Sequence, residues 1–341
     1  MQATNAGLAN GIRATTVGAR SGITIENRGD IDRVASTGNL TFGILAFTLG
    51  ADSPISITHR GNIAVSSDTS DAYGLYGFSL GAGSPVRIDS GGGRIEVSSG
   101  GGDALGIFAR TNGPNSSIAI VNSADIGATS ATEEAWGIRA EIRGSATGTT
   151  SIRNTGDITA TARRDATGLS IVHSASDLSL LIDNSGDVRA SSADERAFGL
   201  YARVRGGTNS PITVINRGDV LASSESGTSY GVFVQNLADG SPAKIVNSGA
   251  ARGEGPEGFG IFVSTFGLGS SVMIENAGRA SGSLTGIYSY SYLDGNHQTK
   301  IINTGDICRR QRLGHKRGGR GQDQDLQCRQ DHGLCGHDRS E

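Results

Sequence analysis

Cysteine, proline and aromatic residues are scarce in this chain of 341 residues. It contains 3 Cys, 6 Pro and 1 Trp, and aromatic residues make up 5% of the sequence. The first 307 residues have no Cys, which suits a chain that crosses an oxidising periplasm, where stray disulfides would block unfolded transit. No apolar run reaches the roughly 18 residues that a membrane-spanning helix requires. The net charge is −3, so we expect no nucleic-acid partner, because such proteins are usually basic.

Glycine is the residue in excess, with 53 copies. A collagen-like protein is excluded because there is no G-X-Y period and little Pro. Disorder is excluded because Ile, Val and Leu recur throughout and the net charge is low. A composition rich in Gly, Ala, Ser and Ile but poor in aromatics favours many short strands joined by tight turns.

Two sequence anchors recur along the chain and define a repeat. The first is Gly followed by an aliphatic residue, and the second reads Ile-x-Asn-x-Gly-Asp-Ile. Successive first anchors lie 26 to 32 residues apart, most often 31 or 32. The Gly of the first anchor stands at Gly11, Gly43, Gly74, Gly106, Gly137, Gly168, Gly199, Gly231, Gly260 and Gly286. The Asn position of the second anchor is assigned to Asn27, His59, Asp89, Asn122, Asn154, Asn184, Asn216, Asn247, Asn276 and Asn303.

Each repeat contains three short runs in which apolar and polar residues alternate, as expected for strands. In the first complete unit these runs are Ile23–Glu26, Ile31–Val34 and Phe42–Phe47. The turns between them contain Gly and Asn, which tolerate positive φ, and no helical period is sustained. The sequence therefore predicts an all-β fold, a single right-handed parallel β-helix (β-solenoid) of about ten coils over residues 1–307, with roughly 31 residues per coil.

Stacking of such coils places equivalent residues above one another. We expect Ile, Val, Leu and Ala to form inward columns and the Asn position to form a hydrogen-bonded ladder, with His59 and Asp89 as polar substitutions in it. The only tryptophan, Trp136, precedes an anchor Gly and is interpreted as an internal packing residue. The same repeat position is aromatic in five other units, at Phe42, Tyr73, Phe198, Tyr230 and Phe259.

Tandem units of the form A-x-G-I-x-A … I-x-I-x-N-x-G-D-I-x-A resemble the passenger domains of bacterial autotransporters, the type V secreted surface proteins. The resemblance covers about residues 5–307. It implies export, translocation across the outer membrane by a C-terminal β-barrel, and a rod that is displayed at the cell surface or released. It also implies a non-catalytic role in adhesion or presentation, with a host or cell-surface protein or glycan as partner. Because neither a signal-peptide pattern nor barrel-like strands are present, we expect a fragment of a longer protein.

The repeat stops after Ile307, and residues 308–341 hold all three Cys. Two functional interpretations apply to this tail: a metal site at Cys328, His332, Cys335 and His337, whose spacing matches no standard zinc motif, and a basic arm at 309–320. A third interpretation explains more. Back-translation of 307–315 and 326–338 with suitable codons, read one base later, restores both anchors in order. We therefore predict a frameshifted, disordered tail, and a nonfunctional product of a broken gene stays an alternative.

Short motifs in the repeats are interpreted as structural. Arg-Gly-Asp occurs at 28–30 and 217–219, where Arg fills a variable slot before the recurrent Gly-Asp. Gly100–Asp103 resembles one copy of a calcium-binding repeat, a motif that needs many tandem copies. His173 and His297 are expected in loops. No catalytic, cofactor-binding or metal-binding residue is predicted.

A carbohydrate-active β-helix enzyme, a polysaccharide lyase or hydrolase, stays open as an alternative. The adjacent carboxylates Glu133–Glu134 and Asp194–Glu195 are candidate acid/base pairs, although solvated corners are the favoured interpretation for both. Such an enzyme needs carboxylates or arginines that converge on one outer face, often with aromatic platforms. The enzyme would be favoured if three or more charged residues of the following set converge in one groove: Arg163, Arg164, Asp165, Asp194, Glu195, Arg196 and Glu225.

Overall fold

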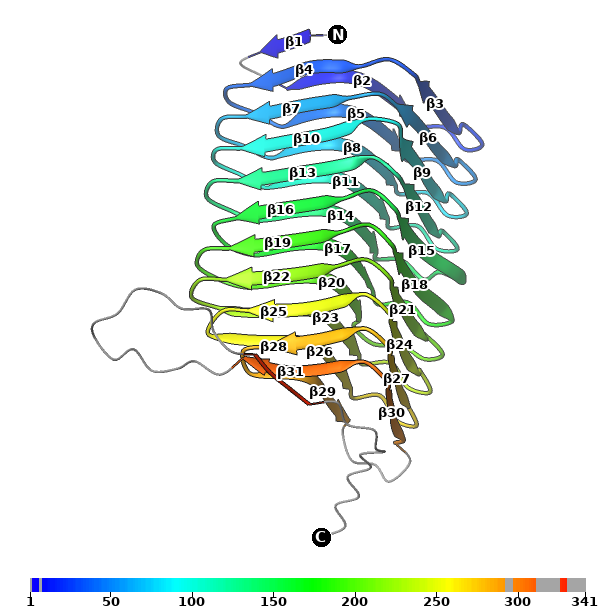
Figure 1. The fold of residues 1–341 in the computed structure, drawn as a ribbon. Helices are drawn as coiled ribbons and strands as arrows, with labels where there is room; N and C mark the ends of the chain where they lie inside the picture. The colour runs from blue at the N-terminus through cyan, green and yellow to red at the C-terminus, as the bar shows by residue number, and fades with distance from the viewer. Residues whose placement is uncertain (1, 6–7, 292–296, 311–325, 330–341) are drawn as a thin grey trace, which may run out of the picture.

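The computed structural model is an all-β rod. It describes residues 2–5, 8–291, 297–310 and 326–329, with side chains described for 8–291 and 297–309. Within these residues there is no helix, and therefore no helix that could span a bilayer. The strands form three sheets that run along the rod (Figure 1), here called sheets A, B and C.

Each coil contributes one strand to each sheet. Sheet A contains β1 (Gln2–Asn5), β4 (Ile31–Ser36), β7 (Ile63–Ser67), β10 (Arg94–Ser99), β13 (Asp125–Ser130), β16 (Ile158–Ala162), β19 (Val188–Ser192), β22 (Val220–Ser224), β25 (Ala250–Glu254), β28 (Arg279–Gly282), β31 (Asp306–Arg310) and β32 (Leu326–Arg329). Sheet B contains β2 (Ala9–Thr16), β5 (Thr41–Thr48), β8 (Ala72–Ser79), β11 (Ala104–Thr111), β14 (Ala135–Ile142), β17 (Ala166–His173), β20 (Ala197–Val204), β23 (Thr228–Asn236), β26 (Glu257–Thr265) and β29 (Thr285–Ser291). Sheet C contains β3 (Ile23–Asn27), β6 (Ile55–Arg60), β9 (Val86–Gly91), β12 (Ile118–Asn122), β15 (Gly148–Asn154), β18 (Leu178–Asn184), β21 (Ile212–Asn216), β24 (Ala243–Asn247), β27 (Val272–Asn276) and β30 (Thr299–Asn303).

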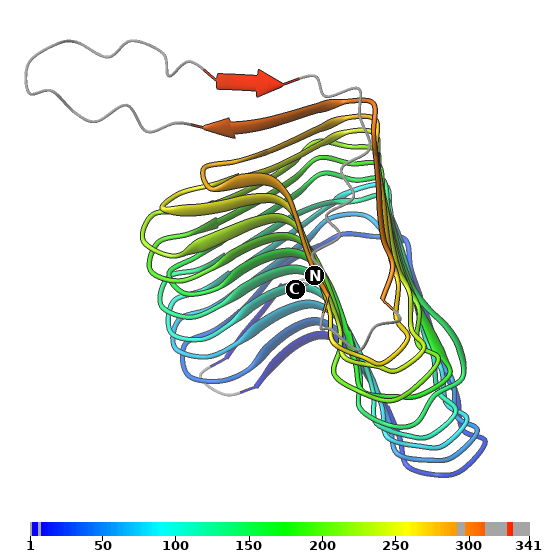
Figure 2. The same cartoon turned by 90° about the horizontal axis from the view of Figure 1, so that it is seen from below.

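The coils stack in register, which confirms the predicted β-solenoid of about ten coils. Neighbouring strands pair in parallel, as in β11 with β14 and β14 with β17. The one exception among the described strands is β32, which pairs antiparallel with β31. Seen along the axis, successive coils superpose and their common outline is bent (Figure 2). Equivalent residues therefore lie one strand spacing apart, about 4.8 Å.

The interior of the rod is aliphatic, as predicted. One buried cluster extends from Ala9 to Ala280 and contains only Ala, Ile, Leu and Val. Its members come from all three sheets, for example Ile138 from sheet B, Ile152 from sheet C and Ile158 from sheet A. Burial of these side chains contributes most of the hydrophobic stabilisation, on the order of 1.5–3 kcal/mol for each fully buried Ile or Leu.

The prediction that the recurrent aromatic position is internal is wrong. A Cβ on the anchor residue Gly43 would lie 2.8 Å from Ile63 Cγ2 and 2.6 Å from the carbonyl oxygen of Gly74, so Gly43 faces the crowded interior. Because side chains alternate along a strand, the preceding Phe42 faces outward. Trp136 occupies the same position and belongs to a separate cluster with Leu105, outside the aliphatic core. The aromatic residues therefore lie on the outer face of sheet B.

The Asn ladder is confirmed. From Asn122 to Asn303, each Asn Nδ2 donates to the Oδ1 of the next coil's Asn at 2.7 to 3.0 Å. Each amide also donates to a backbone carbonyl two residues later, as Asn154 does to Gly156 at 2.7 Å. At the other end, Asn27 Nδ2 lies 3.0 Å from His59 Nδ1. The ladder thus satisfies the amides of a polar column that is buried from Asn122 to Asn276, as buried polar groups require.

The assignment of Asp89 to this ladder is wrong. Ser90 pairs with His59 on one side and with Asn122 on the other, so Ser90 holds the position. The run Gly91–Gly93 contains one residue more than the turns of its neighbours, and this shifts the alignment by one. Asp89 instead faces outward and forms an ion pair with Arg60 at 2.9 Å.

Strand β31 extends three residues beyond the predicted end of the repeat at Ile307. It pairs in parallel with β28, and the fully buried Cys308 is disulfide-bonded and stands opposite Cys328 of β32. His332, Cys335 and His337 of the metal site weighed for the tail lie outside the described residues, as does most of the basic arm. The frameshift is a statement about the gene and stays a prediction.

Candidate binding groove on the outer face of sheet B

The outward side chains of sheet B form three columns that run along the rod. The first outer column is Asn10, Phe42, Tyr73, Leu105, Trp136, Thr167, Phe198, Tyr230, Phe259 and Thr285. The second outer column is Arg13, Leu45, Tyr76, Phe108, Arg139, Ser170, Tyr201, Phe233, Phe262 and Tyr288. The third outer column includes Arg110, Glu141, Val172 and Arg203.

Aromatic rings in these columns stack along the rod axis. Phe42 and Tyr73 have ring centroids 4.9 Å apart with planes 8° from parallel. In the later coils, Phe198 and Tyr230 are 5.2 Å apart at 7°, and Tyr230 and Phe259 are 5.2 Å apart at 11°. These spacings match the strand spacing, because the rings occupy the same position in successive coils. Each such pair contributes about 0.5–1.5 kcal/mol beyond its buried area.

The two aromatic stacks are separated by a groove at β17, which we call the central groove. At this coil the first and second outer columns hold the small polar residues Thr167 and Ser170. The hollow has a volume of about 210 Å³. Its lining residues are Glu134, Trp136, Arg139, Asp165, Thr167, Ser170, Val172, Arg196, Phe198, Tyr201, Arg203 and Arg205.

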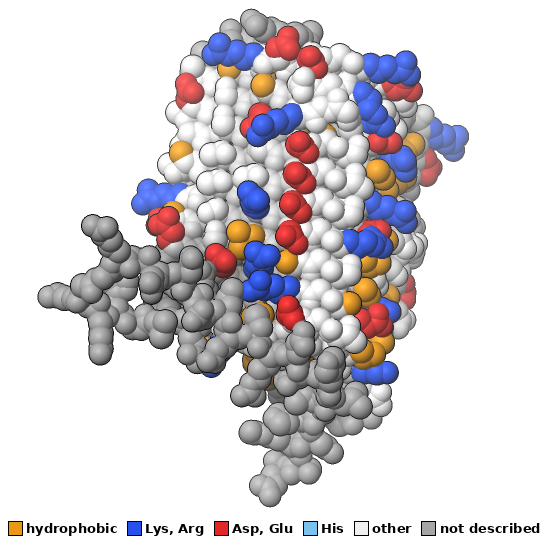
Figure 3. Space-filling view, viewed as in Figure 1, with side chains coloured by type: hydrophobic (Ala, Val, Ile, Leu, Met, Phe, Trp, Pro, Cys, Tyr) orange, Lys and Arg blue, Asp and Glu red, His pale blue; other side chains and the backbone are white. Residues whose placement is uncertain are grey.

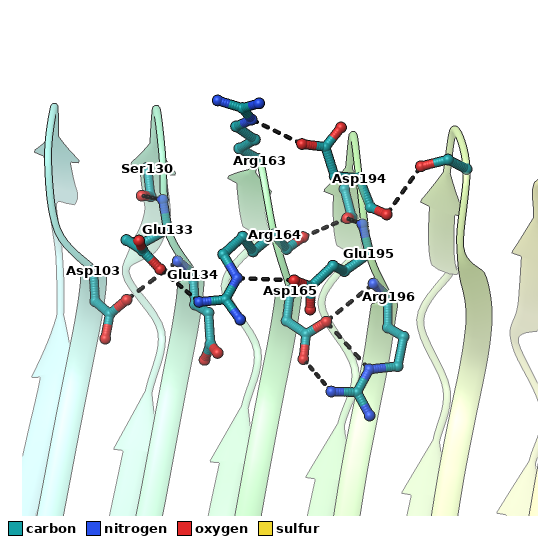
Figure 4. A network of polar contacts seen from close by, with 12 residues as sticks. Asp103, Ser130, Glu133, Glu134, Arg163, Arg164, Asp165, Asp194, Glu195 and Arg196 are labelled. Atoms are coloured by element: carbon teal, nitrogen blue, oxygen red, sulfur yellow. Dashed lines mark hydrogen bonds and ion pairs between the residues drawn. The ribbon is translucent and has the colours of Figure 1, made fainter.

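Cationic side chains form part of each wall. The Arg139 guanidinium lies 4.6 Å from the ring centroid of Trp136, a cation–π contact. The opposite wall contains Arg196, whose Nη2 donates to Asp165 Oδ2 at 2.7 Å and whose guanidinium lies 5.7 Å from the Phe198 ring. The ion pair of Arg196 with Asp165 joins two successive coils across one edge of the groove (Figure 4).

Glu134 is the most perturbed carboxylate of the groove. Partial burial, helped by the nearby charges of Asp103 and Asp165, raises the pKa of its carboxyl to about 7. The residue precedes β14 in the corner between sheets A and B, and its backbone N–H donates to Asp103 Oδ1 at 3.2 Å. The corner position is as predicted, but the expectation of a fully solvated carboxylate is wrong for Glu134, because it turns toward the groove.

The other charged residues of the predicted set form ion pairs along the neighbouring corners (Figure 4). Arg163 Nε donates to Asp194 at 2.8 Å. Arg164 pairs with the coils on both sides, at 2.9 Å from Glu133 of the preceding coil and 2.8 Å from Glu195 of the following coil. Glu225 is exposed. Of the seven residues whose convergence would favour an enzyme, only Asp165 and Arg196 line the central groove, so the test of three or more is not met there.

Both Arg-Gly-Asp motifs lie in the corners between sheets C and A. Asp30 Oδ1 accepts the backbone N–H of Asn62 at 2.7 Å, and Asp219 Oδ1 accepts that of Ala250 at 3.2 Å. Between them, Asp125, Asp157 and Asp187 each accept a backbone N–H from the next coil at 2.9 to 3.1 Å. Asp125, Asp157, Asp187 and Asp219 are equivalent residues of successive coils, and Figure 3 shows acidic side chains in a column along the rod. Their role in joining coils explains the recurrent Gly-Asp.

The remaining motifs have structural surroundings. Gly100 belongs to a corner loop, where a Cβ would lie 2.4 Å from the carbonyl oxygen of Asp68. No group of three His, Cys, Asp or Glu side chains able to hold a metal occurs in the described part of the chain. His297 lies between strands, as predicted, but His173 does not lie in a loop. It ends β17, is 1% exposed, and its Nδ1 accepts the N–H of Ala175 at 2.9 Å.

The sequence marked Glu134, Asp165 and Arg196 as candidates, but it did not predict the central groove that they line. Its walls come from corners and strands about 31 residues apart, and only the stacking of coils brings Glu134, Asp165 and Arg196 together. The absence of an aromatic residue at Thr167, between Trp136 and Phe198, was the signal in the sequence that marks the place. Comparison of the chain with protein-family models, with curated proteins and with solved structures gives no match.

Proposed function

We propose that this protein is a non-catalytic β-helical rod that binds a ligand on the outer face of sheet B. The observation that carries the proposal is the position of the aromatic residues. The core is aliphatic, so outward rings such as Tyr201 and Phe233 are not needed to fill it. Concave sites lined by aromatic and a few convergent polar groups are typical of ligand binding.

The repeats also support a biological setting. Their similarity to autotransporter passenger domains favours a bacterial cell-surface or secreted rod with a role in adhesion or presentation. The partner would then be a host or cell-surface glycan or protein. The long regular axis suits presentation, because side chains on one face repeat at each coil (Figure 1).

Retention on immobilised polysaccharides and proteins tests the proposal. We expect the chain to be retained by at least one ligand and to release no product from it. Tyr201→Ser should weaken retention because it removes a ring from the central groove. Val121→Ser is the control, since Val121 is a partly exposed residue of sheet C, outside the proposed binding face. Equal loss of retention in both variants would contradict a role for the groove.

A polysaccharide-cleaving enzyme is the second candidate, and one observation favours it. Two carboxylates in unlike environments, Glu134 and Asp165, line the same groove. The raised pKa of Glu134, about 7, keeps part of it protonated near neutral pH, whereas Asp165 is ion-paired with Arg196. Pairs of this kind serve as acid and base in glycosidases. Release of reducing ends by the chain, abolished in both Glu134→Gln and Asp165→Asn, would replace the binding proposal with this one.

A further inference from the structure

The first outer column lacks one ring at the central groove. Trp136, Thr167 and Phe198 are register partners in three successive strands. The positions of Trp136 and Phe198 are therefore two strand spacings apart, about 9.6 Å. Thr167 fills only the base of this interval, and Ser170 stands beside it in the second outer column. A ring bound above Thr167 would lie about 4.8 Å from each flanking position, which is within the range for stacked rings.

The edges of this interval are rich in hydrogen-bonding groups rather than apolar. Glu134, Asp165 and Arg196 line one side of it, and the hydroxyls of Thr167 and Ser170 line its base. A planar hydrocarbon ring would form no hydrogen bond with any of these groups, of which Asp165 and Arg196 already pair with each other. A sugar ring offers apolar C–H faces to the aromatic walls, whose π faces are electron-rich, and hydroxyls to the polar rim.

The other side of the groove carries positive charge. Arg203 and Arg205 line it, and neither forms an ion pair with a carboxylate among the residues whose side chains are described. The buried Nε atoms of Arg203 and Arg139 also have no hydrogen-bond acceptor there. Guanidinium groups favour carboxylates because the two match in shape and charge. Arg139 already pairs with Glu141, with 3.6 Å between Nη2 and Oε2. Arg203 and Arg205 have no such partner, and they therefore favour an anionic ligand over a neutral one.

We propose that the central groove binds an acidic oligosaccharide, with one sugar ring seated between Trp136 and Phe198 and a uronate carboxylate held by Arg203 and Arg205. This assignment rests on the proposed binding function and names its ligand class. The ring replaces the missing member of the aromatic stack. The carboxylate supplies the acceptor that the two arginines lack.

Titration with two hexasaccharides tests the ligand class. Trp136 is the only tryptophan of the chain, so its fluorescence reports directly on the groove, and calorimetry gives the affinity. We expect the galacturonate hexasaccharide to bind and to change the Trp136 emission, and neutral maltohexaose to bind at least about tenfold more weakly. The double variant Arg203→Gln with Arg205→Gln should lose about tenfold or more in affinity for the galacturonate, as expected for hydrogen bonds to a charged group. Equal affinity for the two sugars, or no binding of either, would overturn the assignment.

A second variant tests the seat of the ring. Thr167→Phe completes the aromatic column, as Phe198 does one coil later, and should abolish binding without loss of thermal stability. Thr285→Phe adds the same side chain to the same column away from the central groove and should leave binding unchanged. Binding that survives Thr167→Phe would overturn the inference while leaving a binding function elsewhere on the rod intact. Failure of the rod to retain any immobilised ligand would instead remove the proposed function itself.

Discussion

The two faces of sheet B are made by the same strands but follow different rules. Inward residues such as Ile138 and Leu169 are aliphatic and fully buried in successive coils. Outward residues change from Trp136 to Thr167 to Phe198 in consecutive coils. An inward side chain packs against all three sheets, whereas an outward one contacts only its neighbours on the same face. The inward face therefore determines stability, and the outward face is free to vary for binding.

The largest change in the free energy of unfolding is expected for a substitution on the inward face of sheet B. Ile138→Ala removes a fully buried side chain and should lower the free energy of unfolding by about 2–5 kcal/mol, since close packing on all sides leaves a cavity. Urea denaturation followed by circular dichroism measures the change. Val121→Ala is the control, because Val121 is 36% exposed on sheet C. Similar losses in both variants would contradict the division between inward and outward residues.

The Asn ladder is the polar part of the buried interior. Asn184→Ala removes the acceptor of Asn154 Nδ2 and the donor to Asn216 Oδ1, which leaves buried amide groups without partners. We expect a loss of about 2–3 kcal/mol in the free energy of unfolding, also measured in urea. Asn112→Ala, which breaks one partly buried contact with Arg110, serves as the control. A loss as small as that of the control would show that the ladder does not stabilise the stack.

Acid should destabilise the rod through the buried His173. Burial lowers the pKa of His173 to about 4, so the unfolded chain binds its proton first as the pH falls. This contribution to stability is complete above the unfolded pKa near 6.5 and is lost as the pH approaches 4. The loss of stability amounts to roughly 2 kcal/mol already at pH 5. His173→Asn keeps an acceptor for the N–H two residues later, as Asn236 does at 3.0 Å. Melting temperatures of the variant should therefore fall less steeply between pH 7 and 5, and an unchanged slope would refute the assignment.

The smallest effect is expected on the outward face. Tyr201→Ser gives β20 the same side chain that β17 has at the equivalent position, Ser170. Because this position faces outward, no cavity forms in the core. The losses are the stacking of Tyr201 on Phe233 at 5.2 Å and its edge contact with Phe198 at 4.9 Å, each worth about 0.5–1.5 kcal/mol. The melting temperature should fall by only a few degrees. A loss comparable to that of Ile138→Ala would mean that the aromatic columns support the fold as much as the core does.

Much of the fold was predictable because repetition makes local signals redundant. Anchors that recur about every 31 residues predict the coil, the aliphatic interior and the Asn ladder, each of which the structure confirms. One error occurred where the repeat deviates locally. The extra residue in Gly91–Gly93 moved the ladder position from Asp89 to Ser90. His173, predicted in a loop, is the last residue of β17, which has the same length as β14 and β20.

The side on which the aromatic residues lie was not predictable from the pattern alone. Alternation tells which residues share a face but not which face is inward, and both faces of sheet B carry apolar side chains. The contacts of the anchor Gly settle the question, because Gly43 and its equivalents leave no room for a side chain. Phe42 and Trp136 are outward for this reason.

The sequence by itself determined the coil, its length and the identity of the stacked columns, because each is a local pattern repeated many times. Tertiary structure alone decided the candidate site. Glu134, Asp165 and Arg196 belong to three different repeats, and Thr167 is unremarkable until its neighbours in the stack are known. Stacking of coils about 4.8 Å apart converts residues distant in sequence into one groove. Ladder contacts such as Asn154 to Asn184 hold that arrangement in register.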